Sequence, residues 1–154
     1  MTNIHATCMA FGNFGILIRG PSGSGKSSLA LRLIDAEGFG VGSNRLKAKL
    51  VADDQVMLER KGLIISAAPP ATLAGQLEIR GLGIVTLDYV KAVRLHLVVD
   101  LVPTKSIPRM PELADASVKL LGVMLPRLYL DAHTPDAAAK LRAAVVHFKH
   151  NNSF

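Results

Sequence analysis

Residues 20–27 carry the strongest chemical signal in this sequence. They form the pattern of a phosphate-binding loop: a glycine, four variable residues and then Gly-Lys-Ser. Glycines allow backbone N–H groups to wrap a phosphate, and the amino terminus of the following helix adds partial positive charge. In such a loop the lysine contacts the β- and γ-phosphates and the serine binds Mg²⁺. The predicted nucleotide site comprises Gly20, Pro21, Ser22, Gly23, Ser24, Gly25, Lys26 and Ser27.

An acidic pair, Asp53 and Asp54, follows the short apolar run 50–52. Enzymes with a phosphate-binding loop need a carboxylate at the same edge of the sheet, either to bind Mg²⁺ or to act as a base. Neighbouring residues of a strand point to opposite faces, so we expect Asp53 and Asp54 to have different roles. The alternative interpretation is a solvated strand end.

Glu78 and Arg80 lie two residues apart in the run Leu-Glu-Ile-Arg-Gly-Leu-Gly-Ile, residues 77–84. On an extended segment these two side chains share a face. Gly81 and Gly83 permit unusual backbone angles, which suits a loop that approaches a bound ligand. The alternative is an exposed edge strand with a surface ion pair.

Strands and a helix must place these residues together. The apolar segments 4–10 and 14–19 predict two strands joined by a turn at Gly12-Asn13. Apolar residues at helical spacing predict a helix over 27–36, directly after the glycine-rich loop. Strand, loop and helix therefore occur in the order that a nucleotide site requires.

The rest of the chain reads as a β-rich middle and a closing helix. Further strands are expected at 56–60, 63–67, 77–79, 84–87 and 93–102. An irregular stretch follows Pro103, and a helix over 135–147 begins with Thr134 as its N-cap. No repeat or linker divides the sequence. We therefore predict one α/β domain, residues 1–154, with a mixed sheet around the phosphate-binding loop.

Composition narrows the class of protein further. Of the 154 residues 49% are hydrophobic and 19% are charged, which supports a folded core. The net charge of +6 comes from scattered Lys and Arg, so we expect no nucleic-acid binding. Because no apolar run is long enough to span a bilayer, we expect no membrane partner either. Cys8 is the single cysteine, and no leader pattern or membrane-length apolar run is present, so we expect a cytoplasmic protein. A mean hydropathy of +0.32 favours a homo-oligomer.

Together these segments resemble the catalytic, C-terminal domain of HPr kinase/phosphorylase, which phosphorylates a serine of the sugar-transport phosphocarrier HPr. The resemblance covers about residues 4 to 102. It rests on His5 in a strand before the loop, residues 20–27, Val-Ala-Asp-Asp-x-Val at 51–56, and the run 77–84, which is the most family-specific element. The connector Ala-Ala-Pro-Pro at 67–70 is also similar.

The resemblance implies a fold like that of phosphoenolpyruvate carboxykinase, with ATP and Mg²⁺ bound and an HPr-like protein as partner. It implies that Lys26 contacts phosphate and that Ser27 and Glu78 bind Mg²⁺. Asp54 is implied as the base that accepts the serine proton, with His5 and Asp53 in support, and Arg80 shapes the loop beside them. Full-length relatives are hexamers.

Three features depart from longer members of that family. We expect a chain without the amino-terminal domain of those members, similar to the short form of α-proteobacteria. Residues 40–49 look like an insertion with no evident function. Only Leu-Pro-Arg-Leu at 125–128 stands where longer members have a loop linked to dephosphorylation, so we expect the forward kinase reaction to dominate.

Two alternative functions stay open at the level of sequence. A small-molecule kinase shares the phosphate-binding loop, but it normally adds an arginine-rich lid helix, which the sequence does not show. A non-enzymatic regulator would bind ATP and use the acidic pair only for the metal. His96 and Cys8 are expected to be structural and buried.

Overall fold

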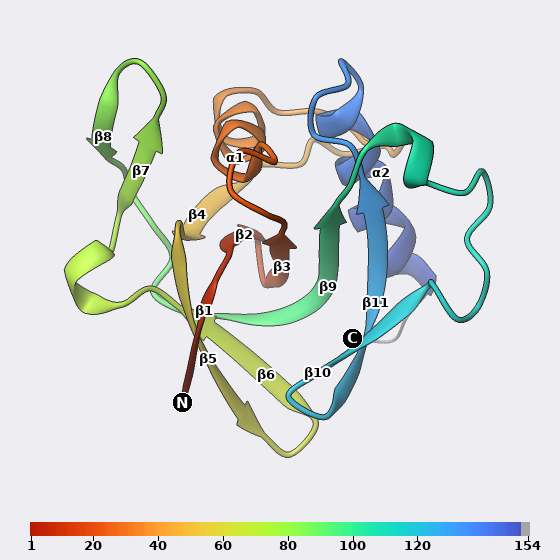
Figure 1. The fold of residues 1–154 in the computed structure, drawn as a ribbon, viewed down its shortest axis with the longest axis horizontal. Coiled ribbons are helices and arrows are strands. Elements are labelled where there is room, and N and C mark those ends of the chain that lie inside the picture. Colours follow the sequence, from red (N-terminus) through yellow and green to blue (C-terminus); the bar gives the residue numbers. More distant parts are fainter. Residues whose placement is uncertain (152–154) are drawn as a thin grey trace.

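Both α-helices pack on one face of a curled mixed sheet (Figure 1). The computed structural model describes residues 1–151. Its helices are α1 (Lys26–Asp35) and α2 (Ala137–Asn151). Its strands are β1 (Thr2–His5), β2 (Thr7–Phe11), β3 (Phe14–Arg19), β4 (Lys49–Ala52), β5 (Gln55–Lys61), β6 (Ile64–Ala68), β7 (Gln76–Ile79), β8 (Gly83–Thr86), β9 (Val93–Leu101), β10 (Ser117–Leu120) and β11 (Val123–Leu130).

The strand that leads into the glycine-rich loop lies inside the sheet. β3 pairs antiparallel with β2 and parallel with β9, and β9 pairs in parallel with β11. β4 lies beyond β2, while β6, β5 and β1 extend the sheet from the start of β9. The predicted mixed sheet is confirmed. Because β3, β9 and β11 run parallel, their carboxyl ends meet at one edge, where ligands bind in open α/β sheets.

Alternate residues of the central strands face two separate apolar cores. On β3, Ile16 and Ile18 pack against the helices, whereas Leu17 packs against residues of β5, β6 and β10. Burial on both faces explains why the central strands are nearly continuous apolar runs. Cys8 on β2 is fully buried in the second core, and burial raises the pKa of its thiol. Over the described chain, neither helix is both long and apolar enough to cross a bilayer.

The predicted strand over 4–10 is two strands in the structure. β1 pairs with β5, whereas β2 pairs with β3 and β4. Between them the N–H of Ala6 donates to the carbonyl of Asp54 at 3.3 Å. The chain thus changes partner at the acidic pair, and the apolar pattern gives no sign of this change. The predicted hairpin turn at Gly12-Asn13 is confirmed, because Phe11 pairs with Phe14.

The prediction of an irregular stretch after Pro103 was wrong for its second half. β10 and β11 form a hairpin there, and residues Arg127–Leu130 of β11 pair with β9. Pro126 has no N–H to donate, which argues against a central strand. It is tolerated because the parallel pairing with β9 begins one residue later, at Arg127. The sheet therefore has one more strand at its ligand-binding edge than the sequence predicted.

Both predicted helices exist, with shifted ends. α1 begins at Lys26, one residue earlier than predicted, and α2 begins at Ala137 instead of 135. Thr134 is not the N-cap of α2, because Pro135 and Asp136 form a turn before the helix begins. The hydroxyl of Thr134 donates to the carbonyl of Asp131 at 3.1 Å and so stabilises the loop before the helix.

Residues 40–49, the apparent insertion, lie partly against α2. A Cβ on Gly40 would come within 2.4 Å of the carbonyl carbon of Arg142, so only glycine fits there. The guanidinium group of Arg142 is buried and donates to the carbonyl of Ala36, just after α1. The segment and this arginine therefore connect the end of α1 to α2.

His96 is a structural residue near the amino-terminal end of β9, away from the glycine-rich loop. Its ring stacks on Phe14 with centroids 4.9 Å apart, and its Nδ1 accepts the N–H of Gly15 at 3.4 Å. Burial, together with the charges of Arg94 and Lys149, lowers the pKa of His96 from 6.5 to about 4, although a hydrogen bond with the backbone of Arg94 opposes the shift. The folded protein therefore disfavours the protonated ring.

We expect the free energy of unfolding to decrease as the pH falls from 6.5 toward 4. Between these pH values the unfolded chain binds a proton at His96 and the folded chain does not. This difference lowers the free energy of unfolding by about 1 to 3 kcal/mol. Urea titrations at several pH values measure this slope. In His96→Phe the slope should be smaller, and an unchanged slope would assign the acid sensitivity to carboxylates instead.

Candidate active site

The glycine-rich loop joins the end of β3 to the start of α1, as predicted. Gly25 is the N-cap of α1, has a φ of +97° and makes no side-chain cap. The first helical turn carries Lys26, Ser27 and Ser28, and its backbone N–H groups have no partner within the helix. Such a turn, with partial positive charge at its end, fits an anionic phosphate group.

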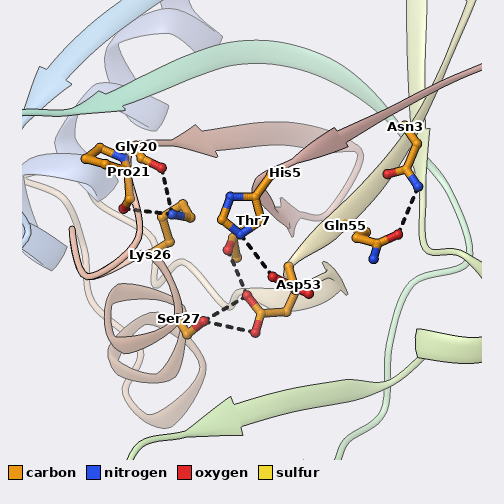
Figure 2. Close-up of polar contacts among 10 residues, drawn as sticks. Asn3, His5, Thr7, Gly20, Pro21, Lys26, Ser27, Asp53 and Gln55 are labelled. Atoms are coloured by element: carbon orange, nitrogen blue, oxygen red, sulfur yellow. Dashed lines mark hydrogen bonds and ion pairs between the residues drawn. The ribbon is translucent and has the colours of Figure 1, made fainter.

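The ammonium group of Lys26 lies against the backbone of this loop. Its Nζ donates to the carbonyl oxygens of Gly20 at 2.7 Å and Pro21 at 3.1 Å (Figure 2). Burial lowers the pKa of Lys26, while the charges of Asp53 and Asp54 oppose that shift. The loop therefore holds a cation beside the amino terminus of α1, as a phosphate site requires.

Asp53 is the buried member of the acidic pair, with 6% of the residue exposed. The hydroxyl of Thr7 donates to its Oδ1 at 2.8 Å, and the hydroxyl of Ser27 lies 3.0 and 2.9 Å from its two oxygens (Figure 2). The resemblance implies Ser27 and Glu78 as metal ligands, and in the structure Ser27 also contacts Asp53. A serine hydroxyl beside a carboxylate is the oxygen donor pair that P-loop proteins use for Mg²⁺.

Asp54 faces the cavity from a strained turn. Its φ is +69°, and the N–H of Gln55 donates to the carbonyl of Asp53 at 2.8 Å. A hydrogen bond across two residues with a positive φ between them is a γ-turn of the rare, strained kind. Aspartate tolerates this backbone better than most residues, and strain of this kind clusters at functional sites.

His5 holds the side chain of Asp54. Its Nε2 lies 2.9 Å from Oδ1 of Asp54, and because a carboxylate only accepts hydrogen bonds, the ring nitrogen donates. Two thirds of the Asp54 side chain is exposed, at 66%. Asp53 and Asp54 therefore lie in different environments, one buried against Ser27 and the other open to the cavity.

The β7–β8 hairpin stands apart from the main sheet, at the upper left of Figure 1. Leu77 anchors it in the core shared with α1, and positive φ angles of +87° and +114° occur at Gly81 in the turn and at Gly83 at the start of β8. Glu78 and Arg80 are exposed on it, and no ion pair within the described part of the chain joins them. Both side chains are therefore available to the cavity beside them.

One cavity of about 660 Å³ collects these groups. Ten of the predicted site residues line it, and nine of these are His5, Ser22, Gly23, Gly25, Lys26, Ser27, Asp53, Asp54 and Glu78. Arg80 also lines it, whereas Gly20, Pro21 and Ser24 do not. Gly20 and Pro21 contribute through the carbonyl groups that hold Lys26.

Four lining residues were not predicted for the site: Ser28, Leu31, Ile79 and His133. Ser28 and Leu31 line the cavity because they lie on α1, and Ile79 lines it because it lies on the β7–β8 hairpin. Nothing in the sequence pattern singles out His133 as a site residue. His133 lies in the loop after β11. Because β11 was not predicted, the position of this loop at the edge of the sheet was not predicted either.

The reduced loop expected at 125–128 is part of β11. Nη1 of Arg127 lies 3.7 Å from the carboxylate of Asp100, and its guanidinium group lies 4.6 Å from the ring centre of Tyr129. Arg19 binds both oxygens of Asp100, at 2.8 and 2.9 Å. Arg127 is thus part of an ion-pair cluster on the sheet and not of a catalytic loop.

The donor atoms in the cavity fit a nucleotide with Mg²⁺. Magnesium is usually held by one or two carboxylates together with phosphate oxygens and water. The hydroxyl of Ser27 and the carboxylates of Asp53 and Glu78 are hard oxygen ligands of this kind, beside a helix amino terminus suited to phosphate.

Comparisons with known proteins identify relatives of this chain. The HPr kinase/phosphorylase of Bordetella petrii is 34% identical over 94% of this chain, and that of Geobacillus kaustophilus is 37% identical over 82%. The chain spans about half the length of these relatives, 47% and 41% respectively. The solved structure of the Hpr(Ser) kinase/phosphatase from Coxiella burnetii superposes with a TM-score of 0.77, covers 97% of both chains and has 22% sequence identity.

The solved structure supports the same fold, an α/β P-loop fold with a mixed sheet. Residues 1–153 match the family described as the HPr Serine kinase C-terminal domain. The match takes in the glycine-rich loop, the acidic pair and the hairpin that together form the cavity. The chain therefore belongs to the HPr serine kinase C-terminal domain family.

Proposed function

We propose that this chain is an ATP-dependent serine kinase whose substrate is an HPr-like phosphocarrier protein. The observation that carries the proposal is the position of Asp54, which His5 holds open to the same cavity as Lys26. A protein kinase needs a base and a phosphate cradle that reach one reacting centre. The names of the relatives supply the substrate class.

Asp54 is the proposed base. A serine hydroxyl is a weak nucleophile, and a carboxylate within hydrogen-bond reach accepts its proton as the reaction proceeds. The serine oxygen then forms a bond to the γ-phosphorus, the bond from that phosphorus to the β,γ-bridging oxygen breaks, and ADP leaves with those electrons. The hydrogen bond from His5 keeps Asp54 pointed at the incoming hydroxyl.

Lys26 and the amino terminus of α1 are proposed to hold the phosphates. Phosphoryl transfer depends mainly on positioning and on stabilising negative charge, and both groups supply positive charge next to the loop. Mg²⁺, when bound, neutralises charge on the β- and γ-phosphates. Ser27, Asp53 and Glu78 are the residues that would hold it, and the hydrogen bond from Thr7 keeps Asp53 in place.

We expect Glu78→Gln to raise the Mg²⁺ concentration needed for half-maximal kinase rate by at least about tenfold. Glutamine keeps the size of the side chain but replaces a charged ligand with a neutral amide. The control is Glu59→Gln on β5, an exposed glutamate outside the cavity. Identical Mg²⁺ titrations for Glu78→Gln and the wild type would assign Glu78 to the surface of the hairpin.

The test of the proposed function is a transfer assay with ATP labelled in its γ-phosphate, Mg²⁺ and HPr-like proteins of the host. Mass spectrometry then maps the modified residue. A labelled serine supports the proposal, and an HPr variant without that serine should stay unlabelled. Label found only on small molecules would indicate a small-molecule kinase, and ATP binding without turnover would indicate a regulator.

The reverse reaction belongs in the same experiment. Phosphoserine-HPr and inorganic phosphate replace HPr and ATP, and release of HPr is followed. We expect the forward reaction to be much faster, because Arg127 is held in β11 by Asp100 and is not carried on a loop near Asp54. Comparable rates in both directions would contradict that expectation and leave the kinase assignment intact.

A further inference from the structure

His133 lies at the wall of the cavity, beside the start of α1. A Cβ on Gly25 would lie 3.5 Å from Cε1 of His133 and 3.0 Å from Cβ of Ala132. The loop after β11 therefore packs directly on the phosphate-binding loop, and an imidazole edge borders the N-cap of α1. No residue of this loop takes part in the proposed kinase chemistry.

Hydrogen bonds from two neighbouring segments hold the loop that carries His133. Oδ1 of Asp131 accepts the N–H of His133 at 2.9 Å, and its Oδ2 accepts the N–H and the hydroxyl of Thr104 at 3.0 and 2.7 Å. These hydrogen bonds lower the pKa of Asp131. The guanidinium group of Arg32 on α1 donates to the carbonyls of Ala132 and Thr134. His133 is thus placed by contacts from α1 and from the segment after β9.

The acidic pair and the loop that carries His133 follow strands on opposite sides of β3. The residues proposed for phosphoryl transfer, Asp53 and Asp54, follow β4, which lies on the β2 side. The loop with His133 follows β11, which lies on the β9 side. A nucleotide whose γ-phosphate meets Asp54 and whose β-phosphate lies in the glycine-rich loop must extend its nucleoside away from the acidic pair. That direction leads toward His133.

We propose that the imidazole of His133 binds the nucleoside part of ATP. This inference rests on the proposed nucleotide function. A flat aromatic ring on a fixed loop can stack on a base, and its ring nitrogens can form hydrogen bonds to the base or ribose. His133 would then add affinity for a nucleoside triphosphate over inorganic phosphate chains.

The test compares two ligands by calorimetry, each with Mg²⁺: ATP and inorganic tripolyphosphate, which has the phosphates without the nucleoside. His133→Ala should raise the Kd for ATP roughly tenfold, the size expected for one aromatic contact with a base. The Kd for tripolyphosphate should stay within about twofold of the wild type. His150→Ala, an exposed histidine near the end of α2, is the control and should change neither value.

Two outcomes would overturn the inference. Equal weakening of both ligands would show that His133 acts on the phosphates or through the packing of Gly25. An unchanged Kd for ATP in a variant with wild-type thermal stability would show no contact at all. Lys26→Ala in the same series tests the proposed function separately, because it should weaken both ligands whatever His133 does.

Discussion

Lys26→Ala is expected to abolish phosphoryl transfer and to weaken the binding of ATP with Mg²⁺. The side chain supplies the cation that the glycine-rich loop holds next to the amino terminus of α1. Phosphoryl transfer has little covalent chemistry for a protein to perform, so loss of charge stabilisation acts directly on the rate. Calorimetry measures the affinity, and the labelled-ATP assay measures turnover.

Lys140→Ala is the control for this variant. Lys140 is an exposed lysine of α2 whose partner is Asp136, and it lies outside the cavity. Its removal changes the net charge by the same amount without touching the loop. Wild-type affinity and rate in Lys26→Ala would contradict the assignment of residues 20–27 to a nucleotide.

Asp54→Asn should lower the kinase rate by about 10²- to 10⁴-fold, the usual contribution of a general base. ATP affinity should change little, because Asp54 is not among the residues proposed to hold phosphate or metal. Asparagine also tolerates a positive φ, so the γ-turn at φ +69° should survive the substitution. The measurements are single-turnover transfer to HPr and calorimetry with ATP.

Asp53→Asn is the informative comparison for Asp54→Asn. Asp53 contacts Ser27 and Thr7 in a buried position, so its loss should act on the Mg²⁺ requirement and on stability. If Asp54→Asn kept its full rate, another group would have to accept the proton. If both variants showed the same Mg²⁺ dependence, the assignment of Asp54 as base and Asp53 as metal ligand would be wrong.

Local patterns predicted the parts of the site that are local in the chain. The loop 20–27 needs only a strand before it and a helix after it, and both are encoded within about fifteen residues on either side. The hairpin at Gly12-Asn13 and the glycines of the β7–β8 turn are likewise short-range features. The resemblance to a family then suggested that distant segments meet.

Contacts between distant segments could not be predicted from periodicity. The exchange of partners at Ala6 depends on where β5 lies, and β11 depends on pairing with β9. That strand falls in the stretch after Pro103 that was expected to be irregular, so the position of His133 after it was not predicted either. The contact of Ser27 with Asp53 was also not predicted, because it depends on where the end of β4 lies relative to the start of α1 in the folded protein.

The single thiol of the chain belongs to Cys8, which lies on β2 next to Thr7. Oxidants and alkylating reagents react with exposed thiolates, and burial here keeps the group both protonated and covered. A reagent can reach the sulfur only when the second core opens, and β2, which also carries the hydroxyl that Thr7 donates to Asp53, lines that core. The folded protein is therefore expected to react with peroxide and disulfides no faster than a protein without cysteine, and an opening that exposes Cys8 would disturb the strand that supports Asp53.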